Sequence, residues 1–88
     1  MRLSGRSAFI TGAAKGIGLS VAKAFSKEGA TVALADMSGD EAIRQASEIE
    51  AETGNKALGV ECDVAHKQSV KNAIEKAADA FGTIDTLA

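Results

Sequence analysis

Short apolar runs alternate along the chain with longer segments in which apolar residues recur at helical spacing. The runs predict strands over residues 7–11, 31–35, 57–60 and 84–88. The second strand ends at Asp36, and the third continues through Cys62 to Val64. The periodic segments predict helices over residues 17–28, 39–53 and 70–81. A glycine follows each predicted helix, as is typical of a helix C-terminus, at positions 29, 54 and 82.

The order of these elements indicates a parallel sheet. Strand and helix alternate three times and a strand follows, with connections so short that the strands must pair in parallel through right-handed crossovers. Ser38 and Glu41 form an expected capping box at the start of the second helix. The sequence therefore predicts an α/β fold: the first half of a Rossmann-type doubly wound sheet, βαβαβαβ, with strand order 3-2-1-4.

A glycine-rich loop joins the first strand to the first helix, with glycines at positions 12, 16 and 18. Gly12 suits a sharp turn at positive φ, Gly16 a close approach of the backbone to a ligand, and Gly18 close packing of the helix on the strands. The N–H groups of the first helical turn would face an anion there. Strand, glycine loop and helix together predict a site for the pyrophosphate of a dinucleotide.

Asp36 and Lys15 bear on which dinucleotide would bind. A carboxylate at the end of the second strand can accept hydrogen bonds from the adenosine ribose hydroxyls of NAD, and it would repel the 2′-phosphate of NADP. Asp36 would otherwise simply start the following turn. Lys15 could meet a 2′-phosphate or be a solvated loop lysine. The balance favours NAD over NADP and leaves the choice open.

Asp63 and Val64 follow the third strand and admit two interpretations. The carboxylate could accept a hydrogen bond from the exocyclic amine of adenine while Val64 lines the ring. Asp63 equally suits the N-cap of the next helix. The spacing alone leaves these interpretations even.

Composition narrows the class of protein. The 88 residues suffice for one small domain, and a net charge of −2 gives no electrostatic footprint for nucleic acid or an anionic membrane. Cys62 is the single cysteine, so no internal disulfide is expected and a cytoplasmic location is favoured. No signal peptide or membrane span is read at the N-terminus. His66 has no matching ligand cluster, so no metal site is expected.

Four features in order resemble the short-chain dehydrogenase/reductase family over the whole chain. The loop from Thr11 to Gly18 resembles the family's Thr-Gly-x-x-x-Gly-x-Gly signature. The run ending at Asp36 is similar to the second strand of NAD-preferring members, and Asp63-Val64 to the pair used at adenine. Residues 81–87, Phe-Gly-Thr-Ile-Asp-Thr-Leu, resemble the entry to the family's fourth strand.

The resemblance implies a cofactor site and an activity. Around the pyrophosphate and its ribose it places Gly12, Lys15, Gly16, Ile17 and Gly18. It assigns the adenosine ribose to Asp36 and Met37, and the adenine ring to Asp63 and Val64. Members of the family transfer hydride between NAD(P) and an alcohol or carbonyl, so a small-molecule alcohol or ketone is the implied substrate.

The chain departs from the family's pattern at its end. The family's Asn-Asn-Ala-Gly motif would begin where Leu87-Ala88 closes the sequence, and the chain contains no tyrosine to match the later Tyr-x-x-x-Lys. No catalytic residue is therefore carried over. We expect residues 1–88 to be a partial dinucleotide-binding domain, truncated after the fourth strand, inactive alone, and part of a homo-oligomer formed through segments it lacks. The alternative is a stand-alone nucleotide-binding or structural fragment without turnover.

Overall fold

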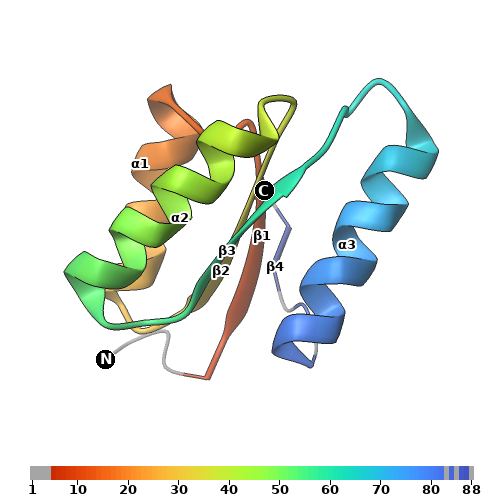
Figure 1. Ribbon diagram of the computed structural model, residues 1–88. Coiled ribbons are helices and arrows are strands. Elements are labelled where there is room, and N and C mark those ends of the chain that lie inside the picture. The colour runs from red at the N-terminus through yellow and green to blue at the C-terminus, as the bar shows by residue number, and fades with distance from the viewer. Residues whose placement is uncertain (1–4, 83, 85, 88) are drawn as a thin grey trace.

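A four-stranded parallel sheet lies between two layers of helices in the computed structural model, which describes residues 5–82, 84, 86 and 87 (Figure 1). The strands are β1 (Ser7–Thr11), β2 (Thr31–Asp36), β3 (Ala57–Glu61) and β4 (Thr86–Leu87). The helices are α1 (Gly16–Lys27), α2 (Gly39–Thr53) and α3 (Lys67–Phe81). The strands lie in the order β3-β2-β1-β4, and each neighbouring pair is parallel.

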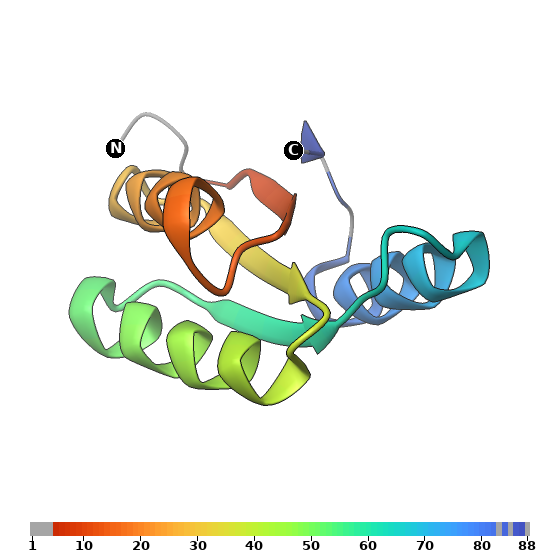
Figure 2. The same cartoon turned by 90° about the horizontal axis from the view of Figure 1, so that it is seen from above.

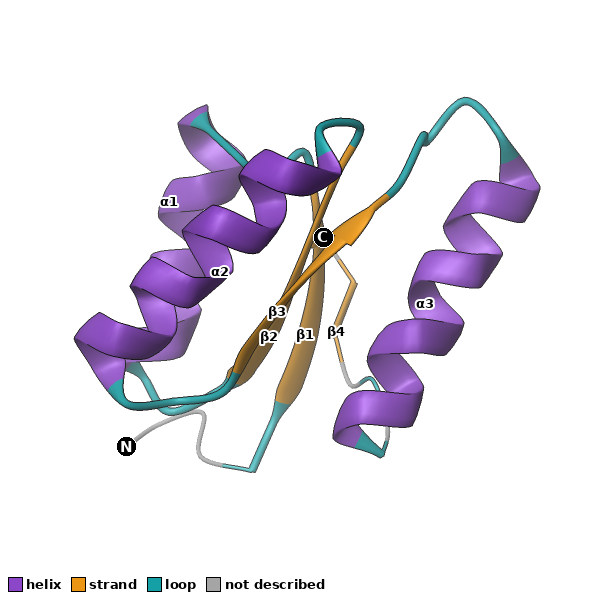
Figure 3. Cartoon of the chain, in the orientation of Figure 1, coloured by secondary structure: helices purple, strands orange, loops and turns teal. Residues whose placement is uncertain are grey.

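Alternate strand residues supply two cores, one on each face of the sheet. Ile10, Val32 and Leu34 face α1 and α2, which cover one side (Figure 3). Phe9 packs with small residues of β2 and with α3 on the other side. Because helices cover both faces, the strands are apolar throughout instead of alternating with polar residues. The α/β class predicted from the sequence is confirmed.

Most predicted boundaries agree with the structure to within a residue or two, and two of them do not. The helix marked by its apolar residues from Val70 begins earlier, at Lys67. The third strand was predicted to run to Val64 but ends at Glu61. Cys62 still donates its N–H to the carbonyl of Asp36 at 2.8 Å, after which the Asp63 N–H turns to the Ser69 hydroxyl at 2.9 Å. This side-chain partner replaces the next bond of the sheet.

The fourth strand pairs with β1 over a short register. Thr86 lies opposite Ala8 and Leu87 opposite Phe9. The predicted strand also included residues 85 and 88, which lie outside the described residues. None of the helices in the described part of the chain is long and apolar enough to cross a membrane.

The capping box predicted for Ser38 and Glu41 is wrong. Ser38 is the N-cap residue of α2, but its side chain makes no capping hydrogen bond. The Ser38 N–H donates instead to Asp36 Oδ1 at 3.0 Å. Glu41 accepts hydrogen bonds from Arg44 and Gln45, one turn further along the helix. A charged guanidinium is the stronger donor, so it draws the carboxylate away from the helix terminus.

Gly59 allows α2 to cross β3 at close range, which the sequence pattern did not reveal. A Cβ atom at this position would lie 2.4 Å from both the nitrogen and the Cα of Ile43, atoms of the backbone that cannot rotate away. Gly54, the C-cap of α2, differs because it has a φ of 75° and open space around it. Gly59 is therefore needed for the close contact between β3 and α2, and Gly54 for its left-handed backbone conformation.

We expect Gly59→Ala to destabilise the fold far more than Gly54→Ala. The clash with α2 should cost about 3 kcal/mol, because a packed helix must move. The left-handed conformation alone should cost Gly54→Ala about 1 kcal/mol. Urea unfolding of both variants measures the difference, and equal losses would contradict the close crossing of α2 over β3.

Candidate functional site

The carboxyl ends of β1, β2 and β3 meet at one edge of the sheet (Figure 1). Thr11 pairs with Ala35, and Asp36 pairs with Glu61, so these strands end side by side. The glycine loop, the turn at Met37 and the connection from β3 to α3 therefore follow one another along this edge. In open parallel sheets this edge is where ligands bind.

The glycine loop needs its glycines for two different reasons. Gly12 has a φ of 60°, in the left-handed region, as expected for a sharp turn. Gly16 shares this conformation with a φ of 65°, whereas the sequence suggested only close approach of a ligand. Gly18 was expected to pack on the strands, but a Cβ there would lie 2.2 Å from the carbonyl oxygen of Gly12. The helix thus begins in direct contact with its own loop.

The first turn of α1 presents backbone N–H groups to the edge of the sheet. Lys15 is the N-cap residue and makes no side-chain capping bond. Within the described residues, the N–H groups of Gly16, Ile17 and Gly18 have no hydrogen-bond partner, while Leu19 donates to the carbonyl of Lys15 at 3.4 Å. Open backbone donors at a helix N-terminus suit an anion.

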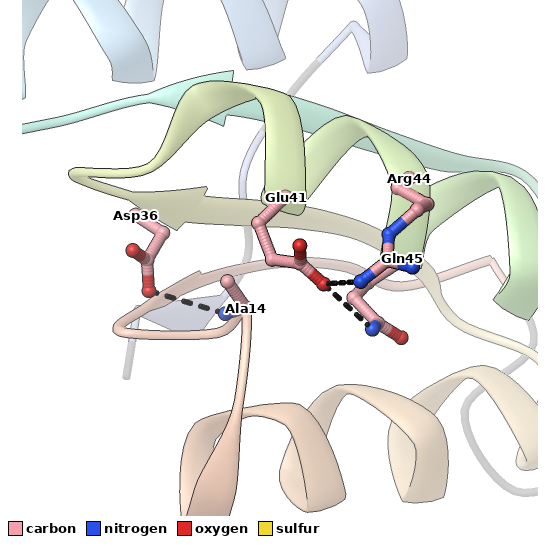
Figure 4. A network of polar contacts seen from close by, with 5 residues as sticks. All are labelled: Ala14, Asp36, Glu41, Arg44 and Gln45. Carbon is pink, nitrogen blue, oxygen red and sulfur yellow. Dashed lines mark hydrogen bonds and ion pairs between the residues drawn. The ribbon is translucent and has the colours of Figure 1, made fainter.

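Asp36 joins the glycine loop to the start of α2 (Figure 4). Its Oδ2 accepts the N–H of Ala14 at 3.2 Å, and its Oδ1 accepts the N–H of Ser38 at 3.0 Å. The expectation that Asp36 starts the following turn therefore describes part of its role. Each carboxylate oxygen has two acceptor positions, so both oxygens can still accept a hydroxyl. Binding of the adenosine ribose by Asp36 stays a prediction.

A cavity of about 460 Å³ lies between the glycine loop and α2. Its lining combines residues of the loop, of the end of β2 and of the first turns of α1 and α2: Ala14, Lys15, Gly16, Leu19, Asp36, Ser38, Glu41 and Gln45. Lys15 is exposed and forms no ion pair within the described part of the chain. The structure thus brings both residues that bear on the cofactor choice, Lys15 and Asp36, to one cavity.

Asp63 lies in a second cavity of about 320 Å³, beside Met37 and His66. Its Oδ1 accepts the N–H of Ala65 at 3.0 Å, and its Oδ2 lies 3.4 Å from His66 Nε2. His66 is the N-cap residue of α3, so of the two interpretations of Asp63 left open by the sequence, the N-cap is wrong. Among the described residues, no group of three His, Cys, Asp or Glu side chains could hold a metal ion.

Large apolar side chains are exposed in the segments that follow β1, β2 and β3. The exposed fraction is 85% for Ile17, 67% for Met37 and 63% for Val64. Each follows the end of a different strand, and all three were predicted to contact the cofactor. Of the three, Met37 lines the cavity that contains Asp63.

Glu41 and Gln45 line the cavity beside the glycine loop, and the sequence pattern did not identify them as site residues. The pattern assigned Glu41 to helix capping, and its place beside Asp36 depends on how α2 packs. Hydrogen bonds from Arg44 and then Gln45 hold the pKa of the Glu41 carboxyl below its usual value. The Glu41 side chain therefore stays ionised near neutral pH. In the sequence, the positions of Arg44 and Gln45, three and four residues after Glu41, were the signal that these side chains would contact its carboxylate.

Comparison with known proteins assigns the chain to a family. The short chain dehydrogenase model matches residues 6–88, so the chain belongs to this family. It is 40% identical over 87 residues to a sorbitol dehydrogenase of Cereibacter sphaeroides, covering 99% of this chain and 32% of the relative. It is 43% identical over 86 residues to the 2,5-dichloro-2,5-cyclohexadiene-1,4-diol dehydrogenase LinX of Sphingobium indicum. This match covers 98% of this chain and 34% of the relative.

A solved structure shows the same backbone arrangement. The hydroxysteroid dehydrogenase of Escherichia coli superposes with a TM-score of 0.92 at 35% identity, over 98% of this chain and 35% of that protein. The chain therefore spans about a third of the length of the relatives it matches.

Cys62 lies behind the edge rather than on it, with 2% of its surface exposed. Burial, and then the neighbouring Asp63 charge, raise the pKa of its thiol. We expect iodoacetamide at pH 8 to alkylate the native protein at least about tenfold more slowly than the protein unfolded in guanidinium, because the thiolate is the nucleophile. Mass spectrometry of quenched samples measures both rates. Equal rates would show that Cys62 is open to solvent.

Proposed function

We propose that this chain binds the adenylate half of a nicotinamide dinucleotide for an oxidoreductase. The family membership supports an enzyme that transfers hydride between the cofactor and an alcohol or carbonyl compound. The named relatives oxidise a sugar alcohol and a cyclic diol, which supports a small-molecule alcohol or ketone as the substrate. The chain matches about a third of these relatives, so this activity is proposed for the protein as a whole.

The hydrogen bond between Asp36 and Ala14 is the observation on which the proposal depends most. It holds the carboxylate at the end of β2 against the glycine loop, 3.2 Å from the Ala14 nitrogen. A ligand whose pyrophosphate meets the open N–H groups of Gly16 and Ile17 would then have a ribose within reach of Asp36. The residues present therefore fit a dinucleotide.

The remaining predicted contacts follow from the same placement. Gly12 and Gly18 shape the loop, and Lys15 lies beside the phosphates. Met37 flanks the adenosine ribose. Asp63 and Val64 flank adenine, although both Asp63 oxygens already have neighbours within the chain. An adenine amine would compete with His66 for Asp63 Oδ2.

The cavity beside Asp36 favours NAD over NADP. A 2′-phosphate on the adenosine ribose would bring further negative charge to a carboxylate that two backbone N–H groups hold in place. Lys15 is the neighbouring cation, and it stands on the exposed side of the loop.

The proposal assigns catalytic residues, substrate contacts and a homo-oligomeric interface to segments outside these 88 residues. The cytoplasm is the proposed location.

We expect Asp36→Asn to weaken binding of NAD by about tenfold, because a charged acceptor of the ribose hydroxyls is lost. NADP should lose less affinity than NAD, or gain affinity, because removal of the repulsion of its 2′-phosphate offsets the backbone hydrogen bond that the amide nitrogen cannot accept. Isothermal titration of the protein in its full encoded length measures both affinities.

Asp40→Asn is the matched control for this substitution. Asp40 is exposed in the first turn of α2 and lies outside the cavity of the glycine loop, yet it carries the same charge. The control should change neither affinity. Equal losses for NAD and NADP in Asp36→Asn would show that Asp36 acts by holding the glycine loop and not on the ribose. No binding of either dinucleotide by the unaltered protein would overturn the proposed function.

A further inference from the structure

Two carboxylates of different origin line the cavity beside the glycine loop. Asp36 comes from the end of β2, and Glu41 from the first turn of α2. From the sequence, Asp36 is expected to influence cofactor choice, and Glu41 is expected to cap α2. The capping role is excluded by the contacts of Glu41 with Arg44 and Gln45, so the place of this carboxylate in the cavity needs a different explanation.

Glu41 is held in a defined position. Its Oε2 accepts hydrogen bonds from the Arg44 guanidinium and from Gln45 Nε2, the latter at 3.1 Å. Figure 4 shows Asp36 directed to the loop at Ala14, and Glu41 directed along α2 toward Arg44 and Gln45. The Glu41 side chain is 34% exposed and that of Arg44 is 64% exposed, so the cation lies on the solvent side of this pair.

The cavity is lined by side chains of both charges. Asp36 and Glu41 contribute two negative charges, and Lys15 contributes one positive charge. Arg44 would be a second cation close to the cavity, but its guanidinium is engaged by Glu41. Asp36 makes the smallest contribution to the Glu41 pKa and acts against its lowering, so the shared cavity lining is what relates the two carboxylates. A phosphate carries up to about two negative charges near neutral pH.

We propose that Glu41 is a second residue that selects against a 2′-phosphate on the adenosine ribose. Its carboxylate adds negative charge to the cavity, and it keeps the Arg44 guanidinium from pairing with a phosphate. This inference rests on the proposed binding of a dinucleotide at the glycine loop. It adds a residue of α2 to the proposed selectivity for NAD over NADP, which otherwise depends on Asp36 at the end of β2.

The test compares adenosine 5′-monophosphate with adenosine 2′,5′-bisphosphate, which differ only in the 2′-phosphate. Isothermal titration uses the protein in its full encoded length. Glu41→Gln removes the charge and keeps the shape, and it should raise the affinity for the bisphosphate relative to the monophosphate by about fivefold to tenfold. Affinity for the monophosphate is the reference in this ratio, because no 2′-phosphate is involved.

Two further variants separate the parts of the proposal. Glu52→Gln makes the same charge change at an exposed position in the last turn of α2 and should leave the ratio of affinities unchanged. Glu41→Gln combined with Arg44→Gln should give a smaller gain than Glu41→Gln alone, because the freed guanidinium is then missing. Circular dichroism of each variant checks that the helices are retained.

The outcomes distinguish this inference from the proposed function. If the unaltered protein binds neither adenosine monophosphate nor a nicotinamide dinucleotide, both are overturned. If it binds the monophosphate with dependence on Asp36, while Glu41→Gln behaves like Glu52→Gln, the proposed site stands and the role of Glu41 is refuted. An undiminished gain in the double variant would refute the part of the proposal that concerns Arg44.

Discussion

The glycine loop has a fixed position because two of its backbone N–H groups donate hydrogen bonds to residues of β2. The N–H of Ala13 donates to the carbonyl of Ala35 at 3.1 Å, and the N–H of Ala14 donates to Asp36 Oδ2 at 3.2 Å. The first contact continues the hydrogen bonding between β1 and β2 beyond the end of the strand. The second uses a side chain that the loop could not supply itself. The direction in which α1 begins, and therefore the direction of its open N–H groups, follows from these two contacts.

Small residues in the core make this arrangement compact enough to work. Figure 2 shows, from above, α1 and α2 against one face of the sheet and α3 against the other. Ala22 of α1 and Ala42 and Ala46 of α2 are buried, and Gly59 lets the backbone of α2 approach β3. Short side chains let helix axes lie close to the strands. The first turn of α2 thereby comes near the glycine loop, and Glu41 reaches the same cavity as Asp36.

The helices and strands could be predicted from the sequence because the signals that indicate them are local. Apolar runs, helical periodicity and terminal glycines each depend on a few adjacent residues, and the predicted helix over residues 39–53 has the bounds of α2. Gly12, Asp36 and the edge they share could also be predicted, since parallel strands end together. The place of Glu41 in the cavity could not, because it depends on the approach of a helix to a loop distant in sequence.

The same distinction explains the predictions that were wrong. Ser38 and Glu41 have the spacing of a capping box, but Asp36 and Arg44 offer these groups stronger partners. Asp63 has the residue type of an N-cap, but the chain makes a further turn before α3, and His66 takes that position. In each case a local preference was overridden by a competing polar contact that becomes visible only in three dimensions.

The central claim is that the edge formed by β1, β2 and β3 binds the adenylate half of a dinucleotide. The most direct measurement is the titration of the ¹⁵N-labelled full-length protein with NAD, followed by the chemical shifts of its backbone amides. The account predicts that the largest changes fall on the amides of Gly16 and Ile17, on Met37 and Ser38 after β2, and on Val64 after β3. Saturable binding that leaves the amides of the glycine loop unchanged would contradict it.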